Sequence, residues 1–330
     1  MQLGLQIMGV EMMAGDALTL DVVPLGADLP FGVIVSGVTR EDLKIAAVRR
    51  QLHGLWIQHG VIVFRGEASP ELHVELSRCF GELEPHPFPE AQEAGSRDLV
   101  KIKYYPDDGT CYEVDGEHLG GWLPWHSDLI YTDRINRGGI LRPVQLPDSG
   151  GMTGFIDQIA AYERLPVALR ERIENLNVVY RAEMNMARHY FVHDGSVRLL
   201  RMARSGSAIA ARGFTFPRVL HPMVFTQKET GRKVLNVSPG FAEGIYEMGG
   251  PEGDDLLREV IAICTDPEGS YFHQWNDGDM VLWDNWRVLH CATGVPPAQT
   301  RVMQRTTIAG DYALGRRLDN TLQSVADFDV

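Results

Sequence analysis

Residues 279–291 read DMVLWDNWRVLHC and hold two short apolar stretches, 279–283 and 287–291, with polar residues between them. Each has the length and apolar character of a short strand. Similar stretches recur elsewhere in the chain, at 61–64, 139–146 and 302–309. Short strands separated by turn residues and a few helices predict a mainly β fold, a sandwich or barrel-like core with helical cover.

Helices are expected between these strands. Apolar residues at helical spacing end at Gly60, and Ser69 followed by proline marks the start of another helix. Residues 157–176 and 254–264 also look helical, whereas 105–121, rich in Gly, Asp and Tyr, are expected to form a long loop. No glycine-rich phosphate loop follows a strand, so a dinucleotide-binding fold has no support.

The composition argues against several classes of partner. The 330 residues include 31 basic and 44 acidic side chains, a net charge of −13, which disfavours nucleic-acid binding. No run of about 18 apolar residues exists to span a membrane, and the first residues do not resemble a signal peptide. The four cysteines form no C-x-x-C pair and fit a reducing compartment. We therefore expect a cytoplasmic enzyme.

The sequence Trp125-His126-Ser127-Asp128 holds an H-x-D pair. On a strand, side chains two residues apart point to the same face, so His126 and Asp128 can reach one metal ion. His290 is the best candidate for a third ligand. Two histidines and one carboxylate leave positions open, as non-haem iron(II) requires. The alternative is chance, because H-x-D pairs are common, buried histidines are often structural, and the chain has 11 histidines.

Two arginines follow His290 at distances of 11 and 15 residues, Arg301 and Arg305. On a strand they share one face, and guanidinium groups that face a core require anionic partners. One would hold the distal carboxylate of 2-oxoglutarate and the other an anionic substrate, through bidentate contacts. Two alternatives stay open. Both arginines could lie on the solvent face, or Arg305 could pair with an internal carboxylate such as Asp284.

Taken together, the motifs resemble the taurine dioxygenase and 2,4-dichlorophenoxyacetate dioxygenase family of iron(II)- and 2-oxoglutarate-dependent oxygenases. The resemblance covers about residues 30–312 and implies a double-stranded β-helix, or jelly roll, with the whole chain, 1–330, as one oxygenase domain with N- and C-terminal extensions. The matching stretches are Gly60–Arg65, Phe80–Leu83, His86-Pro87, Trp125–Asp128, Leu146–Thr153, His221-Pro222, Gly240-Phe241, Leu282–Asn285, His290 and Arg301–Asp311.

The resemblance implies a role for each matching residue. His126, Asp128 and His290 become the iron(II) ligands, and Thr153 and Arg301 become the contacts to the distal carboxylate of 2-oxoglutarate. Dioxygen is the third reactant. The cosubstrate would leave as succinate and carbon dioxide while the substrate is hydroxylated, desaturated or cleaved.

The resemblance also implies a substrate pocket. Arg305 matches the position that holds the sulfonate in taurine dioxygenase, His86 matches a substrate-contacting histidine, and Phe241 belongs to the same pocket. Trp122 and Pro89 replace polar residues of that enzyme. These replacements predict a small anionic substrate with an apolar body larger than that of taurine.

Two other functions use the same scaffold. A zinc-dependent hydrolase could hold its metal with the same three side chains, and only Arg301 and Thr153 speak against it. A binding protein without catalytic activity is the second alternative. The expected partners are a small anionic molecule and further copies of this chain, with neither nucleic acid nor membrane.

Overall fold

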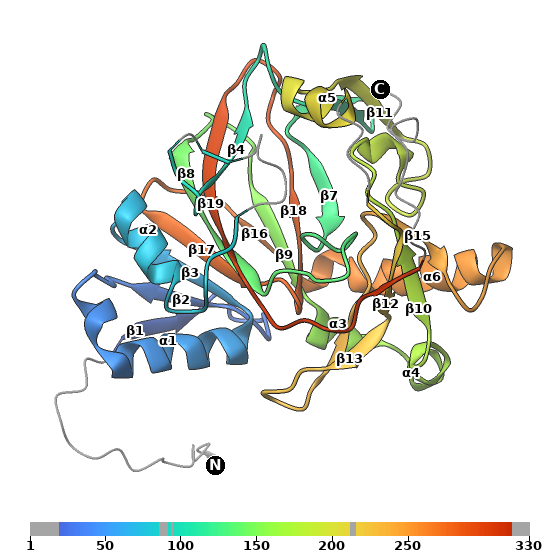
Figure 1. Cartoon of the computed structure of the whole chain (residues 1–330), viewed down its shortest axis with the longest axis horizontal. Helices are drawn as coiled ribbons and strands as arrows, with labels where there is room; N and C mark the ends of the chain where they lie inside the picture. Colours follow the sequence, from blue (N-terminus) through green and yellow to red (C-terminus); the bar gives the residue numbers. More distant parts are fainter. Residues whose placement is uncertain (1–19, 86–91, 94, 212–215, 319–330) are drawn as a thin grey trace.

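Two β-sheets face each other in the middle of the molecule (Figure 1). The computed structural model describes residues 20–85, 92–93, 95–211 and 216–318. In spatial order, the larger sheet contains β1 (Asp21–Pro24), β2 (Val33–Ser36), β3 (Val61–Arg65), β17 (Asp279–Asp284), β8 (Gly138–Gln145), β19 (Arg301–Ile308) and β4 (Val100–Tyr104). The smaller sheet contains β16 (Ser270–His273), β9 (Thr153–Asp157), β18 (Val288–Ala292) and β7 (Leu123–His126).

The chain crosses repeatedly between these two sheets. Successive strands alternate, from β7 to β8 to β9 and again from β16 through β17 and β18 to β19. Neighbouring strands in both sheets are antiparallel except β2 and β3, which are parallel. This alternation is the double-stranded β-helix, or jelly roll, so the predicted fold is confirmed.

Side chains from both sheets fill the space between them. The rings of Phe155 on β9 and Trp283 on β17 lie 6.3 Å apart, and Met303 of β19 belongs to the same buried cluster. Smaller sheets lie beside this core: β5 (Cys111–Val114) and β6 (Glu117–Gly120) with β11 (Val197–Arg201), β10 (Asn177–Tyr180) with β12 (Val219–Pro222), β15 (Ala242–Ile245) and β20 (Arg316–Arg317), and β13 (Val224–Thr226) with β14 (Lys233–Leu235).

Helices cover the outer faces. In Figure 1, α1 and α2 lie beside the larger sheet and α6 lies on the opposite side of the molecule. Their bounds are α1 (Ala46–His59), α2 (Pro70–Ser77), α3 (Gln158–Arg164), α4 (Val167–Ile173), α5 (Arg204–Ala211) and α6 (Pro251–Cys264), with 3₁₀ turns at Asp42–Lys44, Met186–Arg188 and Pro267–Gly269. As predicted, α1 ends at Gly60, whose φ of 74° suits glycine. No helix in the described ranges has the length and apolar character needed to cross a bilayer.

Two expectations about local structure are wrong. Residues 105–121 are not one long loop, because β5 and β6 form a hairpin there, closed by Asp115 and Gly116 with φ of 50° and 86°. Asp-Gly is a typical two-residue hairpin turn, a signal that the polar composition concealed. The helix expected at 157–176 is divided into α3 and α4, because Pro166 cannot donate a backbone hydrogen bond and disfavours a helical residue before it.

Candidate metal centre

Two histidines face each other across neighbouring strands of the smaller sheet. His126 is the last residue of β7, and His290 of β18 is its direct partner in the antiparallel ladder. Their ring centroids are 4.1 Å apart, and both side chains are buried. The ladder therefore brings together two residues that lie far apart in the sequence.

Asp128 joins them from a turn and not from the strand. The predicted strand alternation fails here, because β7 ends at His126 and Leu129 has a φ of 56°. Asn285 holds the turn in place: its Oδ1 accepts from the Asp128 backbone N–H at 2.8 Å, and its Nδ2 donates to the Asp128 carbonyl at 3.0 Å. No sequence pattern indicated this role for Asn285, although it lies in one of the matching stretches.

The three side chains present ligand atoms to one point. Oδ1 of Asp128 lies 3.7 Å from Nε2 of His126 and 3.7 Å from Nε2 of His290, and one such atom from each residue lies within 4.8 Å of the others. Nδ1 of His126 donates to the Pro124 carbonyl at 2.9 Å, which leaves its Nε2 lone pair facing the shared point. Burial and the neighbouring His126 lower the pKa of His290 to about 4, which keeps it neutral and able to bind a metal. Two imidazole nitrogens and one carboxylate oxygen fit iron(II).

The second oxygen of Asp128 is bound by Arg305. Nη1 of Arg305 donates to Oδ2 of Asp128 at 2.6 Å, and both side chains are largely buried. Burial alone would raise the pKa of Asp128, but Arg305 and the neighbouring histidines hold it well below its usual value. The alternative pairing of Arg305 with Asp284 does not form, because Asp284 accepts from Arg137 at 2.9 Å. Nε of Arg305 has no partner among the described residues.

Arg301 occupies the other end of the same strand face. Its Nε donates to the Gly151 carbonyl at 3.0 Å and its Nη2 to Oγ1 of Thr153 at 3.3 Å. No carboxylate of the described residues lies within ion-pair distance of this guanidinium. Burial lowers the pKa of Arg301 to about 10, and the group remains a cation at neutral pH. A buried cation without an anionic partner is costly, and an added carboxylate would offset that cost.

One cavity of about 80 Å³ connects these groups. Both arginines line it, as their shared face on β19 predicted, and so the solvent-facing alternative is excluded. The complete lining consists of Ile102, Leu123, His126, Asp128, Leu141, Thr153, Trp283, His290, Cys291, Ala292, Arg301 and Arg305.

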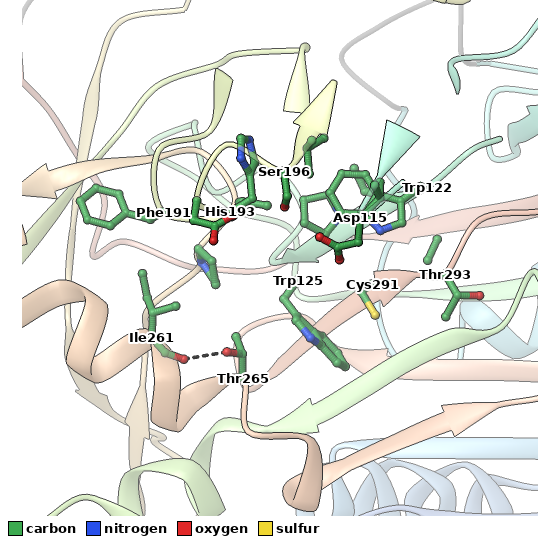
Figure 2. A pocket seen from close by; sticks show the side chains of 18 of the residues that line it. Asp115, Trp122, Trp125, Phe191, His193, Ser196, Ile261, Thr265, Cys291 and Thr293 are labelled. Carbon is green, nitrogen blue, oxygen red and sulfur yellow. Dashed lines mark hydrogen bonds between the residues drawn. The ribbon is translucent and has the colours of Figure 1, made fainter. Parts of the chain in front are cut away.

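A larger pocket of about 550 Å³ lies on the other face of the smaller sheet (Figure 2). Trp125 and Cys291 contribute to it, each adjacent in sequence to a histidine of the metal centre, and Cys291 borders both spaces. Trp122 also lines this pocket, and its ring packs at 5.6 Å against Tyr112. Trp122 is therefore not among the residues that line the metal cavity, although neighbouring Leu123 borders both spaces.

The remaining predicted substrate residues lie elsewhere. Phe241 has a φ of 72°, and its ring lies 4.8 Å from that of Tyr131 and 4.9 Å from that of His189. Burial, and then the negative charge of Asp128, raise the pKa of Tyr131. The Tyr131 ring, against which Phe241 packs, therefore lies within electrostatic reach of Asp128. His86 lies outside the described residues.

Comparison with known proteins agrees with this geometry. Residues 21–307 match the family described as "Taurine catabolism dioxygenase TauD, TfdA family". The chain is 31% identical over 295 residues to an "(S)-phenoxypropionate/alpha-ketoglutarate-dioxygenase" of Sphingobium herbicidovorans, a match that covers 89% of this chain and 96% of the relative. It is 32% identical over 290 residues to an "Alpha-ketoglutarate-dependent 2,4-dichlorophenoxyacetate dioxygenase" of Cupriavidus pinatubonensis, with 84% and 96% covered.

The same fold occurs in solved structures. A taurine dioxygenase from Burkholderia xenovorans superposes with a TM-score of 0.68 at 24% identity, over 93% of this chain and 97% of that one. This likeness supports the jelly roll. The chain belongs to the taurine catabolism dioxygenase TauD, TfdA family, and it is an enzyme of the 2-oxoglutarate (alpha-ketoglutarate)-dependent dioxygenase class.

Proposed function

We propose that this dioxygenase binds iron(II) through His126, Asp128 and His290 and oxidises, by hydroxylation, a small anionic and partly apolar organic molecule. The observation that carries the proposal is Arg301, a buried guanidinium that lines the same cavity as the three ligands and has no acidic partner in the part of the chain that the structure describes. With Thr153 beside it, this group suits the distal carboxylate of 2-oxoglutarate.

Each side chain has a defined task in this mechanism. Arg301 and Thr153 would hold the distal carboxylate of the cosubstrate, in the same cavity as the two histidines. Arg305 holds the second oxygen of Asp128, which leaves only Oδ1 turned toward the histidines. Bound iron(II) supplies the activation of dioxygen, while 2-oxoglutarate supplies two electrons as it becomes succinate and carbon dioxide. The two histidines and both arginines of this cavity are buried, which limits their contact with bulk water.

Arg305 also supports an anionic substrate. Its Nε has no partner among the described residues, so the guanidinium can bind a further anion while it holds Asp128. Two relatives are named for the carboxylates phenoxypropionate and 2,4-dichlorophenoxyacetate, and another, from Pseudomonas putida, is a sulfate ester dioxygenase. We assign Phe241 and His86 to the wall of the substrate site as a prediction, whereas Trp122, expected there from the sequence, lines the pocket on the other face of the smaller sheet.

A zinc hydrolase and a silent binding protein are less well supported. Hydrolysis has no use for a buried cation placed beside the metal site and ready for a second carboxylate, and the family match is to dioxygenases. A binding protein without activity would have no need to bring three ligand atoms within 4.8 Å of one another.

Anaerobic titration tests the proposal. Iron(II) and 2-oxoglutarate together should give a weak visible charge-transfer band that neither gives alone and that shifts when substrate binds. Zinc in place of iron should give no band, which serves as the control. Hydrolysis of a carboxylic ester with zinc, combined with no band with iron, would support the hydrolase instead.

Assembly and location are further proposals. We infer that residues 1–330 act as one oxygenase domain, in the cytoplasm, as a homo-oligomer with neither nucleic acid nor membrane as a partner. The net charge of −13 supports the absence of nucleic-acid binding. Light scattering of the purified chain measures the oligomeric state directly.

A further inference from the structure

The hydroxyl group of Thr153 has both of its acceptor positions occupied. The indole Nε1 of Trp275 donates to Oγ1 at 3.0 Å, and Nη2 of Arg301 donates to the same atom at 3.3 Å. A hydroxyl group offers two lone pairs and one proton. Because two donors occupy the lone pairs, the remaining function of Thr153 is to donate its own proton.

The proton of the Thr153 hydroxyl can point into the cavity beside the metal ligands. Thr153 is buried and lines the 80 Å³ cavity, and no acceptor for its hydroxyl is seen in the ranges that the structure describes. We propose that Trp275 is a positioning residue that makes Thr153 a fixed donor into the cavity, so that the site selects a cosubstrate ending in an ionised carboxylate. This inference rests on the proposed function of Arg301 and Thr153.

The choice of tryptophan matters for this role. An indole N–H can only donate, whereas a serine, asparagine or neutral histidine at the same place could also accept and let the threonine hydroxyl turn away. The Arg301 guanidinium likewise only donates. Thr153 is thus surrounded by donors, which suits an ionised carboxylate because both of its oxygens only accept, whereas the N–H of an amide or the O–H of an alcohol would face these donors.

Packing holds the Trp275 ring in this orientation. Its edge meets the ring of His273 at 4.5 Å between centroids and an angle of 89°. His273 is itself fixed between Tyr271, whose hydroxyl lies 3.0 Å from Nδ1, and Asp279, whose Oδ2 lies 3.2 Å from Nε2. Trp275 lies in the buried cluster between the sheets, so rotation away from Thr153 would open a void.

The indole of Trp275 donates a hydrogen bond, to Thr153, but not every buried indole of the described residues does so. The indole N–H groups of Trp283 and Trp56 have no partner in the described part of the chain. Trp283 lies in the same buried cluster as Trp275, and Trp56 lies in a separate one. Burial of tryptophan in this fold therefore does not by itself require a bonded indole. Trp56→Phe is a matched control, because it shortens a buried ring without removing a hydrogen bond.

The test compares two ligands that differ only at the distal end. Anaerobic titration of the iron(II)-loaded protein gives the Kd of 2-oxoglutarate and of 2-oxopentanoate, which carries a methyl group in place of the distal carboxylate. Trp275→Phe should raise the Kd of 2-oxoglutarate about 3- to 10-fold, the effect of a weakened hydrogen bond, and leave that of 2-oxopentanoate unchanged. Trp56→Phe should change neither.

A double-mutant cycle with Thr153→Val completes the experiment. In that background the Trp275→Phe effect should disappear, because the hydroxyl that it orients is gone. If Trp275→Phe does not fold, benzothienylalanine at position 275 retains the ring shape and lacks only the N–H. An equal loss for both ligands, an undiminished effect in Thr153→Val, or an unchanged Kd for 2-oxoglutarate would overturn the inference. Wild type that fails to bind 2-oxoglutarate would refute the proposed function instead.

Discussion

Arg301 and Arg305 lie four residues apart on one face of β19, yet their surroundings differ. Arg305 has a carboxylate partner, Asp128, at 2.6 Å, whereas the hydrogen bonds of Arg301 within the described ranges go to a carbonyl and a hydroxyl oxygen. Both line one cavity. The difference shows that one end of the cavity is already neutralised, while the other retains an unmatched positive charge. A dianionic cosubstrate is therefore expected at the Arg301 end, and the substrate anion that we propose would share Arg305 with Asp128.

Removing Asp128 should have the largest effect, because Asp128 is both a predicted metal ligand and the carboxylate partner of Arg305. Asp128→Ala deletes one of three ligand atoms and leaves Arg305 without its partner. We expect iron-dependent succinate formation to fall more than about 100-fold, since loss of an outer partner alone costs about 10- to 100-fold.

The control for this variant is Asp133→Ala, which removes a surface carboxylate paired with Arg317. Circular dichroism should show both variants folded. Normal succinate production by Asp128→Ala would refute the metal assignment.

Removing the positive charge of Arg301 should weaken the binding of 2-oxoglutarate. Arg301→Gln retains hydrogen-bond donors but loses the charge, so the Kd of 2-oxoglutarate should rise about 10- to 100-fold, as expected for a charge-assisted contact. Titration of the visible band measures this Kd directly. If the variant retained its 2-oxoglutarate affinity and lost substrate binding, the roles of Arg301 and Arg305 would have to be exchanged.

Removing the positive charge of Arg305 should reduce the preference for an anionic over a neutral substrate. Wild type should turn over an aryl or alkyl acid about 10-fold faster than its neutral amide, a difference in line with a charged hydrogen bond. In Arg305→Ala that preference should collapse, as measured by succinate release.

Because Arg305 also holds Asp128, the iron(II) affinity of the variant must be measured alongside. Arg305→Lys retains the charge without the forked geometry and should recover part of the preference. Equal use of acid and amide by wild type would show that Arg305 is structural only.

The smallest expected effect is on pH dependence. Burial lowers the pKa of Arg301 to about 10, so this cation is fully charged at neutral pH and loses its proton as the pH rises through that value. The Kd of 2-oxoglutarate should stay constant from pH 7 to 9 and about double by pH 10, where half of the free protein has lost the charge. The affinity for 2-oxopentanoate should not change over this range. A Kd that stays constant for both ligands to pH 11 would show that Arg301 keeps its proton over this range, and a fall in the Kd of 2-oxoglutarate with rising pH would contradict the assignment.

Much of the site could be predicted from local patterns. The strand at 301–308 placed both arginines on one face because side-chain direction in a strand has a period of two. The identity of His290 among 11 histidines came from its spacing to those arginines and from family resemblance. Periodicity failed at Asp128, since a turn stabilised by Asn285, more than 150 residues away, bends the chain.

The strand-like stretches at 279–283, 287–291 and 302–309, the type of metal ligands and the shared strand face of Arg301 and Arg305 follow from the sequence, because each depends on residue type and short-range spacing. Which atoms meet depends on the tertiary structure. The ladder register sets His126 opposite His290, Arg305 finds Asp128 and not Asp284, and Trp275 reaches Thr153 across 122 residues. These contacts join segments that come together only when the two sheets pack. A hydrogen bond also requires its donor and acceptor atoms to be placed within a few tenths of an ångström, and no sequence pattern specifies positions that closely.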